Sequence, residues 1–148
     1  MIAHRLSGVA WPLLMYPRAL EAPAPEAFEK LFTQNRWPAA WRNGIFPFDH
    51  YHSNSHEALG VYAGEVTVQF GGDRGVTLTA APGDVIVLPA GTAHKRVSSR
   101  GALGIVGAYP EGSRPDTCMG VPDKSPRIAL PACDPVLGAK GALFQHWK

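Results

Sequence analysis

The stretch that decides the fold runs from Gly44 to Ser98 and contains two segments that carry histidine. The first segment reads GIFPFDHYHSNSHEALGVYAG at residues 44–64, and the second reads GDVIVLPAGTAHKRVS at residues 83–98. Together they supply imidazoles and a carboxylate, the side chains that bind divalent transition metals. We expect four of these side chains to converge on one ion inside a small β-barrel: His50, His52, Glu57 and His94.

The composition is that of one folded domain. The chain has 148 residues, of which 45% are hydrophobic and 18% charged, enough for a substantial core. Its formal net charge of +2, with scattered Lys and Arg, gives no reason to expect a nucleic acid or membrane partner. No apolar run approaches the roughly 18 residues of a membrane span, and the N-terminus lacks the pattern of a secretory signal. With only Cys118 and Cys133, we expect a cytoplasmic protein with reduced thiols.

Residues 9–36 are predicted to form a strand and a helix before the barrel. The apolar run at residues 9–16 favours a strand, and Pro12 within it suggests an edge position. The helix is expected from Pro25 to Asn35, since proline suits the first helical position. Its apolar side chains recur at helical spacing and are predicted to pack in the core: Phe28, Leu31 and Phe32.

Between about residues 40 and 110 the hydrophobic period becomes that of strands. Glycine and proline, 16 and 14 in the whole chain, recur every few residues here, as in short strands joined by tight turns. This regular spacing indicates a sandwich or a barrel. The predicted strands are residues 46–52, 58–62, 66–70, 76–80, 85–88, 93–98 and 103–109.

Residues 111–148 are predicted to be a proline-rich extension that wraps over the barrel. Its prolines break any long element, and residues 127–130 are expected to form at most a brief strand or turn. A disordered tail would carry fewer apolar side chains. The expected anchors are Val136, Leu137, Leu143, Phe144 and Trp147.

Strand parity brings the proposed metal ligands together. His50 and His52 lie two apart on a predicted strand, so both imidazoles point to one face. Glu57 has the opposite parity, but a turn at residues 53–55 can bring it to the same interior. Three imidazoles and one carboxylate leave positions for water or substrate, as in a catalytic or ligand-binding site. His56 is expected on the other face, with a role as alternate ligand left open.

Other side chains near this site are candidates for substrate contacts. Arg96 and Ser98 share the parity of His94 and should face the interior. Arg96 would either bind an anionic substrate or form an internal ion pair. Tyr62 is a candidate for the mouth of the barrel, as are Tyr109 and Trp41. Tyr51 should face away, and Cys118 is expected to be a free thiol, with a redox or lid role as the alternative.

These residues and spacings resemble the cupin superfamily. The first cupin motif has Gly, five residues, His-x-His, three or four residues, Glu, six residues and Gly, and residues 44–64 match it throughout. The second has Gly, five residues, Pro-x-Gly, two residues, His, three residues and Asn. Residues 83–98 match it except that Ser98 stands at the Asn position. The chain also resembles a small bacterial single-domain cupin subfamily at residues 37–44, 50–53, 89–92 and 107–110.

The resemblance implies an all-β fold: a double-stranded β-helix, the cupin jelly-roll barrel, with one short N-terminal helix and a C-terminal wrap. It implies that the ligands are His50, His52, Glu57 and His94, and that the ion is Fe, Mn, Ni, Zn or Cu. Two functions follow as expectations: a metal-dependent oxygenase or isomerase acting on a small molecule, or a non-enzymatic small-molecule or metal-binding module. A homodimer is one expectation, since cupins commonly dimerise through barrel strands. The tryptophan-rich and C-terminal apolar residues would either supply such an interface or cover the barrel.

Overall fold

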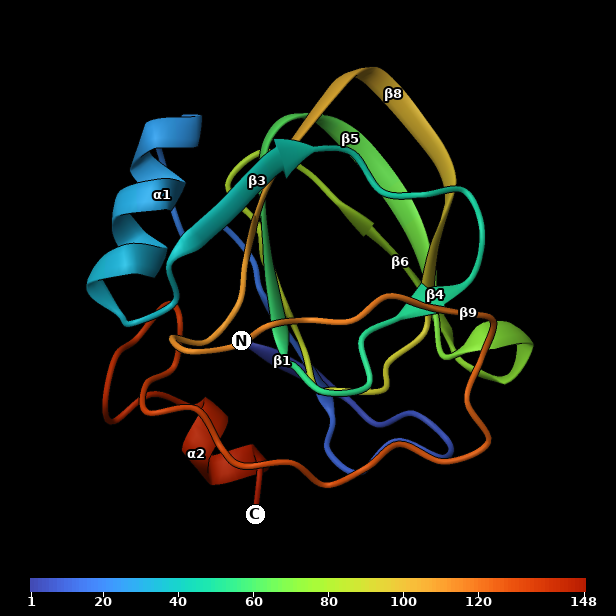
Figure 1. The fold of residues 1–148 in the computed structure, drawn as a ribbon. Coiled ribbons are helices and arrows are strands. Elements are labelled where there is room, and N and C mark those ends of the chain that lie inside the picture. Colours follow the sequence, from blue (N-terminus) through green and yellow to red (C-terminus); the bar gives the residue numbers. More distant parts are fainter.

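Two long strands form the centre of the fold, β5 (Glu57–Phe70) and β8 (His94–Ala108). In the computed structural model, which describes residues 1–148, they pair antiparallel along most of their length and curve strongly (Figure 1). The remaining elements, in chain order, are β1 (Ile2–His4), β2 (Leu13–Tyr16), α1 (Pro25–Gln34), β3 (Ala39–Asn43), β4 (His50–Tyr51), the short 3-10 helix η1 (Gly72–Arg74), β6 (Val76–Ala80), β7 (Val85–Leu88), β9 (Cys118–Met119) and α2 (Leu143–His146).

The strands form one nine-stranded sheet in the order β1-β2-β7-β5-β8-β4-β9, with β3 added to β8 and β6 added to β5. Every pairing in it is antiparallel. The sheet curls around a central space, and α1 covers its outside (Figure 1). This arrangement is the predicted double-stranded β-helix with one short helix before the barrel.

Hydrophobic side chains are buried on both faces of the curled sheet. Alternate residues of each strand point to opposite faces, so β7 places Ile86 and Leu88 in one buried cluster and Val85 and Val87 in another. The first cluster lies within the barrel, and the second lies under α1 and the C-terminal segment. The helix contributes Phe28 and Phe32 to the second cluster, as its spacing predicts.

Both long strands continue through places where the sequence predicts turns. Gly64 and Gly101 adopt positive φ angles of 72° and 73°, but each lies within a strand rather than ending one. The pairing of β5 with β8 shifts register on either side of Ala63. Such bulges bend and twist a strand without breaking it, so a single strand can pass from one side of the barrel to the other. The breaks predicted between strands 58–62 and 66–70 and between strands 93–98 and 103–109 are therefore wrong.

Three predictions about the N-terminal half also need correction. The first predicted strand begins only at Leu13 and lies between β1 and β7, so it is not an edge strand. Pro12 precedes it and removes no ladder hydrogen bond. The strand predicted at residues 46–52 is reduced to β4, because Pro47 has no N–H to donate to a ladder. Strands β1 and β3 were not predicted.

The C-terminal segment packs along the barrel and is tied to it by tryptophan hydrogen bonds. Trp147 donates from Nε1 to the Pro12 carbonyl at 2.8 Å, and Trp37 donates to the Cys133 carbonyl at the same distance. Leu143 and Trp147 are buried as expected, whereas Leu137 is 56% exposed and anchors nothing. Residues 127–130 form neither helix nor strand.

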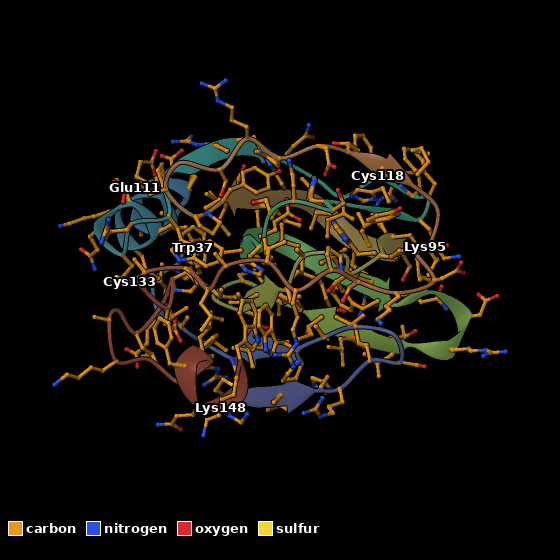
Figure 2. The ribbon with its side chains drawn as sticks, turned by 60° about the horizontal axis from the view of Figure 1, so that its bottom comes forward. Trp37, Lys95, Glu111, Cys118, Cys133 and Lys148 are labelled. Atoms are coloured by element: carbon orange, nitrogen blue, oxygen red, sulfur yellow. The ribbon has the colours of Figure 1, made fainter.

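Both cysteines are free thiols, and they lie at opposite ends of the molecule (Figure 2). None of the helices has the length and hydrophobicity needed to span a bilayer.

Candidate metal centre

Three of the four predicted ligands meet at one end of the barrel. Glu57 begins β5, His94 begins β8, and His52 follows β4. The Nε2 atom of His52 lies 3.3 Å from one Glu57 carboxylate oxygen, and that of His94 lies 3.2 Å from the other. One ligand atom from each side chain lies within 4.8 Å of the other two, and all three residues are buried. This group has the donors and the spacing to hold a metal ion.

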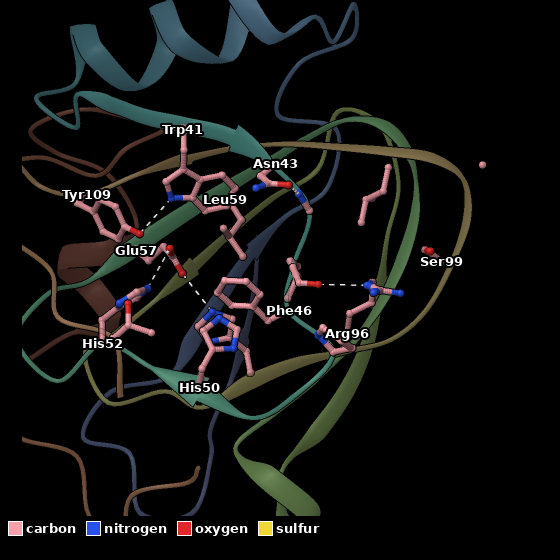
Figure 3. A pocket seen from close by; sticks show the side chains of 17 residues that line it. Trp41, Asn43, Phe46, His50, His52, Glu57, Leu59, Arg96, Ser99 and Tyr109 are labelled. Carbon is pink, nitrogen blue, oxygen red and sulfur yellow. Dashed lines mark hydrogen bonds and ion pairs between the residues drawn. The ribbon is translucent and has the colours of Figure 1, made fainter. Parts of the chain in front are cut away.

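His50 stands beside this group rather than within it. It pairs in register with His94 across β4 and β8, and the two ring centroids are 4.1 Å apart. Its ring centroid is 6.4 Å from that of His52. His50 lines the same cavity as the other three (Figure 3). The structure thus gathers all four residues, with His50 as the outer member.

Backbone carbonyls orient the three imidazoles. The Nδ1 atom of His50 lies 3.0 Å from the Phe48 carbonyl oxygen, and that of His94 lies 2.9 Å from the Thr92 carbonyl oxygen. The Nδ1 atom of His52 is bonded in the same way to the carbonyl of Asp116. A carbonyl only accepts, so each Nδ1 carries a proton, and in the neutral imidazole each Nε2 has a free lone pair. This tautomer is the one that binds a metal through Nε2.

Charge within the group favours an ionised carboxylate. Burial alone would raise the pKa of Glu57, but the adjacent imidazoles of His52 and His94 outweigh it and hold that pKa well below its usual range. Burial would likewise lower the pKa of His52, yet the carboxylate of Glu57, to which a protonated Nε2 would donate, raises it. The Oε1 atom of Glu57 is buried without a hydrogen-bond partner. A buried anionic oxygen without a donor is costly, so the residues present fit a cation at this position.

The group lies in the wall of a cavity of about 580 Å³, a size that suits a small organic molecule. Tyr109 also lines it and accepts a hydrogen bond of 3.1 Å from Trp41 Nε1 (Figure 3). Burial, together with the charge of Glu57, raises the pKa of Tyr109, which therefore remains a neutral phenol. Sequence reasoning left the positions of Tyr109 and Trp41 open, and both line the cavity.

Comparison with known proteins agrees with this architecture. The family model described as "Cupin domain" matches residues 42–101. "Uncharacterized protein YjlB" from Bacillus subtilis (strain 168) is 36% identical over 144 residues, a match that covers 93% of this chain and 86% of the relative. The chain belongs to the cupin superfamily.

The similarity to solved structures is lower. A DUF861 family protein from Thermotoga maritima is 21% identical with a TM-score of 0.41, covering 66% of this chain and 98% of that one. Vicilin from Solanum lycopersicum (tomato) is 19% identical with a TM-score of 0.47, covering 74% of this chain and 29% of that one.

Two of the three predicted substrate contacts of this cupin lie outside the cavity. Tyr62 packs beside the outer cluster under α1, on the face opposite to Glu57. Ser98 is exposed because of a bulge in β8. Thr67 pairs with Ser98 and the next residue, Val68, pairs with Arg96, so Val97 is an extra residue without a partner on β5. This bulge reverses the parity after Arg96, so Ser99 lines the cavity in its place.

Arg96 lines the cavity as predicted. Its Nε donates to the Ile45 carbonyl at 3.1 Å, and no carboxylate lies within ion-pair distance of its guanidinium. The alternative of an internal ion pair is therefore wrong.

Asp116, which was not predicted from the sequence, connects the C-terminal segment of this cupin to residues 52–54 through hydrogen bonds. Besides its carbonyl bond to His52, its carboxylate accepts a hydrogen bond of 2.7 Å from the Ser53 N–H and another from the Ser53 hydroxyl. Its own N–H donates to the Asn54 side chain at 3.0 Å. The adjacent Thr117 lines the cavity, and Cys118 pairs with Tyr51 in the β4–β9 ladder. No spacing signal marks Asp116, because it lies in an irregular segment far from the cupin motifs.

Asp116→Ala keeps the carbonyl that accepts from His52 but removes the carboxylate that holds this carbonyl in place through Ser53. We expect the variant to release bound metal about tenfold faster than the wild type, at the low end of the 10–100-fold that partners orienting a ligating histidine contribute to metal affinity. The measurement is transfer of Co²⁺ from loaded protein to a chromophoric chelator. Asp116→Asn keeps an acceptor for Ser53 and should release metal more slowly than Asp116→Ala. The exposed Asp73→Ala is the control. Equal release rates for Asp116→Ala and Asp73→Ala would contradict this role.

His56 lies outside the metal group and joins the barrel to the C-terminal segment. It is 1% exposed, its Nδ1 accepts a hydrogen bond of 3.0 Å from the Ala90 N–H, and its Nε2 lies 3.0 Å from the Ala129 carbonyl oxygen. Its ring packs against Trp11 and Trp147, with centroid distances of 5.8 and 4.8 Å. A neutral imidazole satisfies both bonds. Burial accordingly lowers the pKa of His56 to about 4.

Acid should therefore weaken the fold through His56. Because the unfolded chain takes up this proton near its ordinary pKa of 6.5 and the folded chain only near 4, stability is lost as pH falls between these values. The loss is about 3 kcal/mol at 1.36 kcal/mol per pKa unit. We expect denaturant unfolding of EDTA-treated protein to show a shallower pH dependence for His56→Gln than for wild type. His4→Gln is the control, and parallel pH profiles for His56→Gln and wild type would refute the assignment.

Proposed function

We propose that this cupin is a metal-dependent enzyme of oxygenase or isomerase type that acts on a small molecule. The observation that supports this is the buried Glu57, flanked by His52 and His94, in the wall of a cavity open to small molecules. A bound divalent ion, of Fe, Mn, Ni, Zn or Cu, would supply Lewis-acid chemistry or dioxygen binding at its open positions.

The chain itself supplies the rest of the proposed site. His52, Glu57 and His94 would hold the ion, with His50 beside them. Tyr109 would donate its phenol proton in a hydrogen bond to a substrate oxygen, because burial and the charge of Glu57 keep it protonated. Apolar side chains of the lining, among them Ile45, Leu59 and Leu103, would exclude water from the bound molecule.

We also propose that a small molecule, not a nucleic acid or a membrane, is the partner, and that the protein works in the cytoplasm. The near-balanced charge and the two free thiols support these proposals. A homodimer remains a prediction. The exposed edge strand β1, with Ile2 49% exposed, is one surface that offers free backbone groups for pairing.

The test begins with elemental analysis of untagged protein purified without chelator. We expect close to one equivalent of a transition metal, and less than about a tenth of an equivalent would overturn the proposal. Oxygen consumption and product analysis with small diols, thiols and keto acids then follow. Turnover that disappears with EDTA and returns with metal supports an enzyme. Full metal occupancy without turnover of any candidate class favours the non-enzymatic binding module.

A further inference from the structure

The cavity has two chemically different ends. His52, Glu57 and Tyr109 lie on one side of it, and Arg96 and Ser99 lie on the other, with Phe46 between them (Figure 3). The first end is the candidate metal centre. The second end carries a permanent positive charge, because an arginine side chain stays protonated in proteins.

The guanidinium of Arg96 is only partly used by the protein. Its Nε donates to the Ile45 carbonyl at 3.1 Å, and neither terminal nitrogen has a hydrogen-bond partner within the chain. Glu57 is the one acidic side chain in the lining, and it lies between the imidazoles of His52 and His94 at the other end of the cavity. Because the guanidinium is planar, the bond at Nε fixes the orientation of the two terminal nitrogens. Their N–H groups have the spacing to donate to the two oxygens of one carboxylate.

The wall between the two ends is largely apolar. Ile45, Leu59 and Leu103 line it, and the exposed ring of Phe46 stacks on Phe48 with centroids 4.9 Å apart beside the opening. A molecule that fits this cavity needs an anionic group at one end, an apolar middle and a group able to reach the metal centre.

We propose that the substrate is a small organic acid whose carboxylate binds Arg96 while its opposite end faces His52, Glu57 and His94. This inference rests on the proposed function, because it names the substrate class of the same site. Arg96 then sets which end of the molecule reaches the ion, and Ser99 stands beside it as a neutral hydrogen-bonding group.

The test is calorimetric titration of metal-loaded protein with hexanoate, hexanamide and the linear dicarboxylates from malonate to suberate. We expect the carboxylates to bind at least about tenfold more tightly than the uncharged amide, as a charge-assisted bidentate pair allows. Arg96→Gln should remove this preference. Arg96→Lys should restore part of it, since it keeps the charge without the fork. The exposed Arg100→Gln, on the same strand, should leave it unchanged.

Two results would overturn the inference. One is equal affinity for hexanoate and hexanamide. The other is carboxylate binding that Arg96→Gln leaves intact, because the anion would then sit on the metal. Repeating the titration on EDTA-treated protein separates the two proposals. If EDTA-treated protein still prefers hexanoate over hexanamide and the preference depends on Arg96, the organic-acid site is supported even if elemental analysis rejects the metal centre. If the protein binds stoichiometric metal but shows no such preference, only the organic-acid site is rejected.

Discussion

The His94→Ala variant should be purified with less than about a tenth of an equivalent of transition metal, under conditions that load the wild type. His94 supplies one of the two imidazoles that face Glu57, at 3.2 Å from its Oε1 atom. Loss of an outer partner of a ligand already costs 10–100-fold in affinity, so loss of a ligand should cost more than about 100-fold. The measurement is metal content per protein, followed by equilibrium competition with a chelator of known affinity.

The expected loss is local to the site. His94→Gln retains most of the side-chain volume, so it separates loss of a ligand from collapse of a small buried space. His4→Ala, on the edge strand β1, is the matched control and should keep full occupancy. Added metal should raise the unfolding temperature of the wild type and of His4→Ala but leave that of His94→Ala unchanged, because only a bound ion stabilises the folded state. Full occupancy in His94→Ala would show that the ion is bound elsewhere.

His50 gives the sharper test of the ligand set. It lies in the cavity with its ring 4.1 Å from that of His94, but it stands outside the three residues whose ligand atoms are mutually close. The cupin motif predicts that His50→Ala also abolishes stoichiometric binding, while His56→Ala retains it. Full occupancy in His50→Ala would mean that His52, Glu57 and His94 hold the ion without it.

The site was predictable from sequence where its residues follow fixed spacings. His50 and His52 share a face because strands alternate, and the motif added Glu57 and His94. The same rule, counted from Glu57 along β5, places Tyr62 on the opposite face. Parity failed at Ser98 because the bulge at Val97 is set by the pairing of β8 with β5, and a single strand's sequence does not record its partner's register.

The side-chain contacts of the C-terminal segment could not be predicted from sequence, for a different reason. Asp116 and Asp134 act through hydrogen bonds to residues that are far away in the chain. The bond from Tyr16 to Asp134 joins residues separated by 118 positions, and the bond between Asp116 and His52 joins residues separated by 64. Neither residue belongs to a periodic element, so hydrophobic patterning carries no information about it. Such contacts follow only from the assembled fold.

Asp134→Ala should lower the free energy of unfolding by about 3–5 kcal/mol. Asp134 is fully buried, and its carboxylate accepts hydrogen bonds from the Tyr16 hydroxyl and from the N–H groups of Val136, Leu137 and Leu143. No cation takes part, so the four donors alone offset the desolvation of this charge. Removing the carboxylate leaves buried donors unpaired at the start of α2 and along the preceding turn, and this part of the C-terminal segment should detach first.

Urea denaturation measures the change, and hydrogen exchange locates it. We expect faster exchange of the Leu143 N–H in Asp134→Ala than in wild type, with little change in the barrel strands. Asp134→Asn keeps two acceptor sites but places an amide group near donors, so its effect should be smaller. A double-mutant cycle that combines Asp134→Asn with Tyr16→Phe gives the coupling free energy between these two side chains.

The control is the exposed Asp73→Ala, which should change the free energy of unfolding by less than about 0.5 kcal/mol. A similarly small change for Asp134→Ala would mean that apolar packing holds the C-terminal segment rather than this carboxylate. Trp147 and Leu143 supply that packing, because both are buried in the cluster under α1.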